Sequence, residues 1–314
     1  MKYLKTLTDG ERVNGIYMVK SKNSALTKMG KEYENVVLQD KTGTMDCKIW
    51  DPNSAGISDF DAMDFIEVSG KTNSFNGMIQ MSIERARKVS EGEYDPADYV
   101  PTSSRNVEDM WKELMSYLNQ IKNPYLAALR DEFFVKDEDF IKKFKASSAA
   151  KSIHHGFVGG LLEHSCNVTR LCDTYAKFYP ILNRDLLVLA ASLHDIGKLK
   201  ELSLFPTNDY TDEGQLLGHI IIGVEMVDEK LRKLPDFPEK LANELKHLIV
   251  SHHGELEYGS PKKPALIEGI ALSMADNLDA KMEQVTELFN STESTTWLGF
   301  NKLLDSNIRK TSQE

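Results

Sequence analysis

The chain has 314 residues, of which 41% are hydrophobic and 27% charged, an ordinary composition for a globular protein with room for more than one domain. It contains no run of about 18 apolar residues, so we expect no membrane span and no membrane partner. The formal net charge of −10 argues against a protein that coats nucleic acid non-specifically.

Charge and histidine are unevenly distributed along the chain. Residues 1–90 carry 13 Lys+Arg against 12 Asp+Glu, so the remaining 224 residues hold a net charge of −11. All eight histidines lie between positions 154 and 253. The simplest interpretation is two regions with different chemistry.

The cellular compartment is indicated by two features. The N-terminal stretch MKYLKTLTDGERV lacks the apolar core of a signal peptide. The three cysteines (Cys47, Cys166 and Cys172) are an odd number without zinc-like pairing. Both favour a reduced compartment, and we expect a cytoplasmic protein.

Up to about residue 90, the chain consists of short stretches in which apolar and polar residues alternate, separated by residues that favour turns. Five stretches predict strands: RVNGIYMV, YENVVLQD, TMDCKIW, DFIEVSG and MIQMSIERARKV. DKTG at 40–43 and NSFNG at 73–77 predict tight turns, and DPNSAGISDFDA, between the third and fourth strands, has the length of a loop or short helix. Five strands, two hairpins and this insertion are typical of an OB-fold barrel.

From Asn106 onward the apolar period becomes three and four residues. An amphipathic helix with Asn106 as its N-cap is predicted by the residues that follow this period, Val107, Trp111, Leu114, Leu118 and Ile121. The stretch before it, YDPADYVPTSSR at 94–105, has two prolines and no periodicity, and we interpret it as a linker. Further helices are expected at 125–134, 137–146, 158–178, 185–195, 214–234, 238–252, 264–290 and, last, near 296–309. The second region is therefore all-α.

Polar, metal-capable residues interrupt the apolar faces of these helices. A single inward histidine is more often a hydrogen-bonded core residue than a ligand. Four helices that each offer such a residue would leave many buried polar groups to satisfy without a metal. Imidazole and carboxylate together suit Mn²⁺, Fe²⁺, Co²⁺ or Zn²⁺. In chain order the residues are His164, His194, Asp195, His219, His252, His253 and Asp276.

This order, H…HD…H…HH…D, resembles that of the HD-domain metal-dependent phosphohydrolases over roughly residues 150–290. The resemblance implies that one metal is held by His164, His194, Asp195 and Asp276. Members that bind two metals add histidines between the doublet and the last aspartate, which here match His219 and His252, with His253 adjacent. Asp195 would bridge the two ions, and whether His252, His253 or both reach the second ion stays open. Two such ions can activate water and stabilise the leaving oxygen of a phosphoryl displacement.

Three further residues have a possible substrate role next to these ligands. Lys198, one helical turn beyond Asp195, is placed to neutralise a phosphate oxygen, and its other interpretation is a solvated lysine at a helix end. His154 and His155 precede the first ligand helix and either touch the substrate or are ordinary loop residues. His247 lies off the helical face of His252, and we interpret it as structural or surface.

The predicted barrel carries aromatic and basic residues suited to a single strand. OB-folds stack bases on aromatics and place cations along the backbone. This region resembles the nucleic-acid-binding OB-folds in its Gly-Lys-x-Tyr, Leu-x-Asp-x-Thr-Gly and Lys-x-Trp pattern. The alternative is that Tyr33 and Trp50 fill the barrel core and the lysines are ordinary surface. The candidate contacts are Tyr33, Trp50, Phe75, Lys31, Lys41, Lys48 and Lys71.

An OB barrel followed by this HD domain resembles the YhaM-type 3′→5′ exoribonucleases over nearly the whole chain. The resemblance implies release of nucleoside 5′-monophosphates from single-stranded RNA, with two divalent ions, Mn²⁺ first among the candidates, and single-stranded DNA as a second substrate. We expect an OB-fold nucleic-acid-binding domain at 1–93, linker and connecting helices at 94–150, the HD domain at 151–290, and a C-terminal helix and tail at 291–314.

Two other functions stay open on sequence grounds. One is an HD-type phosphohydrolase acting on nucleotides or small phosphodiesters, with the barrel serving assembly. The other is a non-catalytic RNA-binding protein with a structural metal site. The oligomeric state is open as well, because TTWLGFNKLL at 295–304 is apolar enough to pack on its own domain or on another copy in a homo-oligomer.

Overall fold

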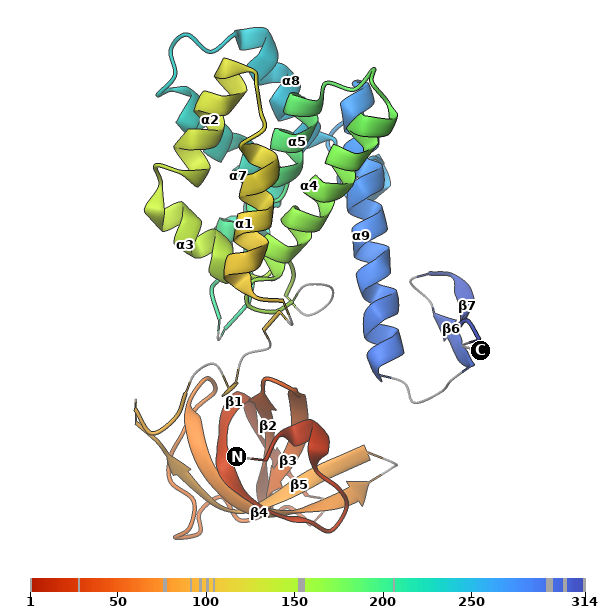
Figure 1. Ribbon diagram of the computed structural model, residues 1–314. Helices are drawn as coiled ribbons and strands as arrows, with labels where there is room; N and C mark the ends of the chain where they lie inside the picture. The colour runs from red at the N-terminus through yellow and green to blue at the C-terminus, as the bar shows by residue number, and fades with distance from the viewer. Residues whose placement is uncertain are drawn as a thin grey trace. The chain divides into compact units, whose positions relative to one another are not determined.

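The computed structural model describes residues 2–27, 29–75, 78–90, 92–95, 98–99, 102–103, 105–151, 156–205, 207–291, 296–301 and 304–312. The chain divides into two compact units, Met1–Thr102 with Phe205–Thr207, and Ser103–Leu204 with Asn208–Glu314. Figure 1 shows the first unit as a β-barrel and the second as a set of helices that ends in a small hairpin. The finer domain boundaries at 93, 150 and 290 stay predictions.

The first unit is a closed five-stranded barrel with the strand order β1-β2-β3-β5-β4. Strands β3 and β5 run parallel, and every other neighbouring pair is antiparallel. The predicted OB-fold barrel and its five strands are confirmed. The strands are β1 (Arg12–Leu26), β2 (Glu32–Asp40), β3 (Gly43–Ile49), β4 (Phe65–Phe75) and β5 (Met78–Lys88), after a 3-10 turn η1 (Leu4–Thr6).

Alternation of side chains builds the barrel core. Val36 and Leu38 of β2 and Cys47 and Ile49 of β3 point inward and are buried. The insertion between β3 and β4 adds Phe60, which is only 1% exposed, to this core. Residues 50–64, all of them described, form turns and one isolated bridge, so the insertion is a loop and not a short helix.

The predicted turns have different outcomes. In DKTG, Asp40 pairs with Gly43, and its Oδ1 accepts a hydrogen bond from the backbone N–H of Thr42 (2.7 Å), which confirms a tight turn. In NSFNG, residues 73–75 belong to β4, and positions 76 and 77 lie outside the described residues. Strand β1 continues to Leu26, further than predicted, because a bulge after Val19 lets it keep pairing with β2.

The second unit is helical from Val107, as predicted. Asn106 is the N-cap of the first helix, since its side chain accepts from the backbone N–H groups of Glu108 (2.9 Å) and Asp109 (3.1 Å). The helices are α1 (Val107–Leu118), α2 (Pro124–Phe134), α3 (Glu138–Ala146), α4 (Gly160–Phe178), α5 (Arg184–Leu193), α6 (Lys198–Glu201), α7 (Asp212–Leu231), α8 (Glu239–Val250) and α9 (Ile267–Ser291), with a 3-10 turn η3 (Leu256–Tyr258).

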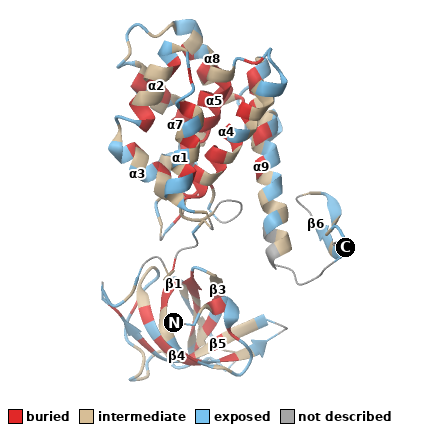
Figure 2. Ribbon diagram, viewed as in Figure 1, coloured by how far each residue is buried: buried red, intermediate tan, exposed pale blue. Residues whose placement is uncertain are grey.

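Helix α5 is the centre of this unit. Every residue from Leu186 to Leu193 is buried, and the helix packs against α1, α2, α4, α8 and α9. Figure 2 shows the buried residues gathered on α5 and on the side of α4 next to it. The apolar run that precedes the His194–Asp195 doublet is therefore a wholly buried helix, and the doublet emerges at its end inside the bundle. No helix in the described part of the chain is both long and apolar enough to cross a bilayer.

Two helix predictions need correction. The helix expected near 296–309 is a two-stranded sheet of β6 (Trp297–Asn301) and β7 (Ser306–Arg309). A helix is interrupted there because Gly299 has φ +90° at a register shift of the pair, and Asp305 also has a positive φ (46°). The helix expected at 185–195 ends at Leu193, and a separate short helix, α6, follows it.

The turn between α5 and α6 packs directly on α7. Gly197 has an ordinary helical φ of −60°, but a Cβ built on it would lie 1.9 Å from the backbone oxygen of His219. On the other side of this contact, Gly218 takes φ +72° and kinks α7, and the next backbone N–H, of His219, donates to Glu201 Oε1 (3.0 Å). These two glycines let the doublet and His219 come close together.

Gly197→Ala is expected to destabilise the protein by about 3 kcal/mol, the upper end for overpacking, because the added Cβ meets backbone atoms that have no room to move. Gly223→Ala is the matched control on the α7 side of the same contact, since its Cβ would meet no atom closer than 3.6 Å. It should be neutral or stabilising by up to about 1 kcal/mol, the helix preference of alanine over glycine. Thermal unfolding of the two variants checks this, and equal stabilities would contradict it.

Candidate metal centre

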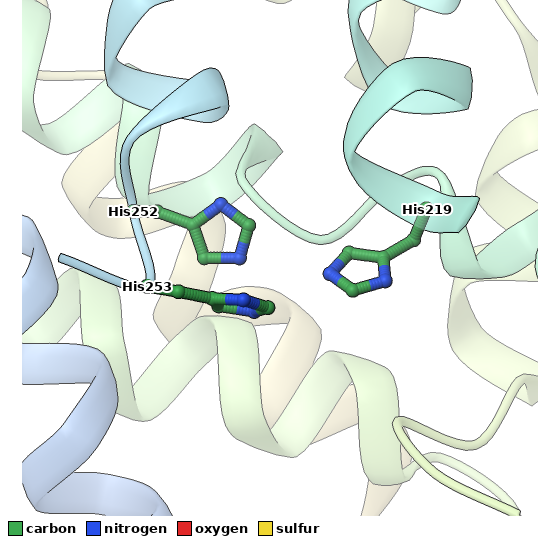
Figure 3. Close-up of side chains that lie close together, drawn as sticks. All are labelled: His219, His252 and His253. Atoms are coloured by element: carbon green, nitrogen blue, oxygen red, sulfur yellow. The ribbon is translucent and has the colours of Figure 1, made fainter. Parts of the chain in front are cut away.

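The predicted ligands come from five separate helices and meet at one place in the second unit. His164 lies on α4, His194 and Asp195 follow α5, and His219 lies just after the kink of α7. The pair His252–His253 follows α8, and Asp276 lies on α9. Figure 3 shows the rings of His219, His252 and His253 facing one another from two segments.

The first group of ligands surrounds one oxygen of Asp195. His164 Nε2 lies 3.2 Å from His194 Nε2, 3.2 Å from Asp276 Oδ1 and 3.4 Å from Asp195 Oδ2. His194 Nε2 lies 3.5 Å from the same Asp195 oxygen. Four donor atoms from two helices and one turn thus converge on a space that a single ion can occupy.

The second group faces the other oxygen of Asp195. His219 Nε2 and His252 Nε2 each lie 3.6 Å from Asp195 Oδ1. Ligand atoms of His219, His252 and His253 all lie within 4.8 Å of one another. Within the described part of the chain, Asp195 Oδ1, His219 Nε2 and His252 Nε2 are buried and have no hydrogen-bond partner. Three converging buried acceptor atoms without donors fit a cation.

Hydrogen bonds on the far side of each ring orient the histidines. The Nδ1 atoms of His194, His252 and His253 face backbone oxygens of Ala191 (2.8 Å), Ile249 (2.6 Å) and Tyr258 (2.8 Å). A carbonyl oxygen only accepts, so each Nδ1 carries the proton and each Nε2 presents a lone pair to the centre. This is the usual support of a metal-binding imidazole.

Two carboxylates that sequence reasoning missed support the remaining histidines. Asp279 Oδ2 lies 2.7 Å from His164 Nδ1, and Glu201 Oε1 lies 3.0 Å from His219 Nδ1. Both carboxylates are nearly buried, at 9% exposure. Asp279 had a signal in the sequence, because it lies one helical turn after Asp276 on the same face of α9. Glu201 had none, since only the close packing of α6 on α7 brings it to His219.

The electrostatics of the centre favour bound cations. Burial raises the pKa of the Asp195 carboxyl, but Lys198 and the surrounding imidazoles outweigh burial and hold it well below its usual range. Burial lowers the pKa of His194, and burial with neighbouring imidazoles takes that of His252 well below its ordinary value, so both are neutral donors. For His164, burial lowers the pKa, but hydrogen bonds to Asp276 and Asp279 raise it to about 10. Nε2 of His164 thus attracts positive charge, either a proton or a metal ion that displaces it.

A cavity of about 310 Å³ opens beside these ligands and is lined by His164, His253, Asp276 and Lys198 among others. The Lys198 ammonium lies 2.7 Å from Asp195 Oδ2, so it is at the centre and not a solvated helix-end lysine. His154 and His155 lie outside the described residues. His247 lies away from the centre, where its Nε2 accepts a hydrogen bond from the backbone N–H of Ala265 (2.9 Å).

In the barrel, the predicted aromatic pair lies on the outer face of β2 and β3. The rings of Tyr33 and Trp50 stack with centroids 5.2 Å apart, and Trp50 is 47% exposed. The Lys48 ammonium lies 5.6 Å from the Tyr33 centroid and also pairs with Asn35 Oδ1. Neither aromatic belongs to the barrel core, so the alternative that both fill it is wrong.

Two of the remaining barrel candidates lie near connections between strands. Lys31 is exposed just before β2, and Phe75, at the end of β4, is 61% exposed. Lys71 is exposed in the middle of β4. The β2–β3 face and the β1–β2 and β4–β5 connections are where OB-folds bind oligonucleotides. Lys41, by contrast, is paired with Asp98 (2.9 Å).

Known proteins resemble this chain over nearly its whole length. The family described as HD domain matches residues 161–281, a span that contains every predicted metal ligand. The "3'-5' exoribonuclease YhaM" of Geobacillus sp. (strain WCH70) is 35% identical over 88% of this chain and 84% of its own length. Proteins of the same name from Bacillus velezensis and Bacillus subtilis (strain 168) are also 35% identical, over 87% and 88% of this chain and 86% and 87% of their own lengths.

One solved structure, the second OB-fold domain of replication protein A from Methanococcus maripaludis, aligns with 30% of this chain and 98% of its own. The identity is 17% and the TM-score 0.23. The barrel is identified by its own strand order and not by this likeness.

Glu201→Gln and Asp279→Asn are each expected to weaken divalent-metal binding by about 10- to 100-fold, because the neutral amide holds the imidazole less firmly and makes it a poorer ligand. Isothermal titration of the protein with Mn²⁺ measures this directly. Glu225→Gln, an exposed residue of α7, is the control and should bind as the unaltered protein does. Unchanged affinity in both test variants would contradict a supporting role.

Proposed function

The chain belongs to the YhaM family of 3′-5′ exoribonucleases and is itself a metal-dependent 3′-5′ exoribonuclease; from this premise we propose that it removes nucleoside 5′-monophosphates from single-stranded RNA at a centre for two divalent cations that share Asp195. Single-stranded DNA is proposed as a second substrate. The metal is proposed to be Mn²⁺.

The division of the Asp195 carboxylate supports the two-cation proposal. One oxygen faces His164, His194 and Asp276, and the other faces His219 and His252. A single ion would leave one of these groups of buried donors unused. Two ions would satisfy both groups through one shared carboxylate. The mixed imidazole and carboxylate donors suit Mn²⁺, and the same donors are open to Fe²⁺, Co²⁺ or Zn²⁺.

Two cations at such a site supply Lewis acidity to a phosphodiester and lower the pKa of water. The residues of the protein hold the cations and orient the phosphodiester. Neutral imidazoles of His194 and His252 present their lone pairs inward. The buried carboxylate of Asp195 and the half-buried carboxylate of Asp276 provide negative charge that water screens only weakly. Lys198 lines the cavity and is proposed to contact a phosphate oxygen of the RNA.

The barrel is proposed to bind the RNA strand. The Tyr33–Trp50 stack offers a flat apolar surface for bases, and Lys48 lies beside it. Phe75, Lys31 and Lys71 extend the exposed aromatic and basic surface of this unit. The nearly balanced charge of residues 1–90 implies modest affinity that falls with salt.

The cytoplasm is the proposed compartment. Its support is that Cys47, Cys166 and Cys172 are all free thiols and all buried. A homo-oligomer also remains a proposal, and its support is the exposed Trp297 (61%) and Phe300 (59%) of the C-terminal hairpin.

Asp195→Asn is expected to lower kcat/KM for RNA decay by at least about a hundredfold in saturating Mn²⁺, because it would weaken the one ligand that both cations would share. RNA binding by the barrel should persist. The assay uses single-stranded RNA labelled at either end: the 3′ label should appear at once as mononucleotide, and the 5′ label as a ladder of shortening products. Asp236→Asn, exposed in the turn before α8, is the control. Normal decay by Asp195→Asn would overturn the mechanism.

Trp50→Ala and Tyr33→Ala are each expected to raise KM for long RNA by about 5- to 150-fold, the range for loss of one base-stacking contact. Hydrolysis of a small phosphodiester such as bis(p-nitrophenyl) phosphate should not change, since it needs the metal centre alone. Phe178→Ala, a 75% exposed residue of α4, serves as the control. Equal losses on long RNA and on the small ester would argue against strand binding by this face.

A further inference from the structure

The cavity beside the metal centre is partly lined by residues that are not candidate metal ligands. Besides metal-centre residues, it is lined by Tyr258, Ser273 and Asn277 and by three alanines, Ala149, Ala150 and Ala280. Its volume of about 310 Å³ is at the lower end for ligand sites, which suits a single nucleotide unit. The small alanine side chains leave room for a flat group. The hydroxyl of Ser273 and the carboxamide of Asn277 can form hydrogen bonds with a sugar without adding charge.

Tyr258 lies in the wall of this cavity with its backbone fixed by hydrogen bonds and its ring exposed. Its carbonyl oxygen accepts the hydrogen bond of His253 Nδ1 (2.8 Å), and its N–H donates to Glu255 O (3.1 Å). The side chain nevertheless lines the cavity and is 66% exposed. An exposed aromatic at a fixed distance from a metal ligand is a suitable platform for a base.

The turn that carries Tyr258 is held firmly against α9. Gly254 has φ +81°, and a Cβ there would lie 2.3 Å from Ser273 Oγ. The backbone at Gly254 therefore lies too close to α9 to leave room for a side chain between them. At the other end, Gly259 has φ +92° and its N–H donates to Leu256 O (3.0 Å). The segment from 253 to 259 therefore holds Tyr258 at a fixed position relative to His253.

We propose that this cavity receives the 3′-terminal nucleotide of the RNA and that the Tyr258 ring stacks on its base. This inference rests on the proposed hydrolysis at the adjacent two-cation centre. A cavity that holds one nucleotide would explain why the RNA is shortened by one nucleotide at a time. Stacking tolerates every base, so the cavity selects for an unpaired end and not for a sequence.

The test compares RNA of one sequence with a normal or an abasic 3′-terminal nucleotide. With the normal RNA, Tyr258→Leu should lower kcat/KM about tenfold, and Tyr258→Phe and Tyr258→Trp should keep most of it, because they keep a ring. With the abasic RNA, the unaltered enzyme should lose about as much, and Tyr258→Leu should lose no more, since the stacking partner is already gone. Leu256→Ala, in the same turn but not lining the cavity, is the control for the turn itself.

Two results would overturn the proposal. One is that Tyr258→Leu loses equally on both RNAs, which would place its effect on His253 and not on the base. The other is that the unaltered enzyme cuts normal and abasic ends equally well, which decides the question even if Tyr258→Leu does not fold. Absence of decay of either RNA by the unaltered enzyme with Mn²⁺ would instead reject the proposed function. Mn²⁺ titration of Tyr258→Leu should match the unaltered protein, because only the backbone of Tyr258 holds His253.

Discussion

The buried charge of Asp195 is the constraint on which the helical unit depends. Asp195 is 2% exposed, and the free-energy cost of an isolated ionised carboxylate at such a buried position would be too high for it to stay charged. It remains charged because the Lys198 ammonium lies 2.7 Å from its Oδ2. Lys198 begins α6, Asp195 follows α5, and His219 of α7 faces the other carboxylate oxygen, so the ends of these helices must meet at one point.

This requirement explains both how the helices pack and why some buried polar atoms have no hydrogen-bond partner in the part of the chain that the structure describes. Helix α5 is buried on all sides and delivers the doublet into the bundle, and the glycine contact between Gly197 and α7 brings His219 to the opposite side. The result leaves buried polar atoms of Asp195, His219 and His252 that have no partner within the described residues. Such atoms weaken a fold by themselves, whereas bound cations satisfy them and stabilise the folded state in proportion to their affinity.

In the proposed mechanism, the two units use different physical chemistry toward the same RNA strand. The barrel offers stacked aromatic rings, which are suited to any base, and the metal centre offers charge, which is suited to any phosphate. In the proposed arrangement neither part reads a sequence of bases. Under this proposal the enzyme would degrade single strands in general, and its selectivity would come from whether an end is free and unpaired.

Local pattern in the sequence determined which elements form and which residues are candidate ligands. Alternation predicts the five strands, the period of three and four predicts α1, and the order of His164, the doublet, His219, the second pair and Asp276 indicates a metal centre. Only tertiary structure decided which groups face each oxygen of Asp195, that Glu201 supports His219, and that Trp50 lies outside the core of the barrel. These depend on contacts between segments far apart in the chain, which no local period encodes. The C-terminal hairpin was missed for a related reason: its apolar residues suit a helix, and the positive φ of Gly299 and Asp305 is a property of the folded backbone.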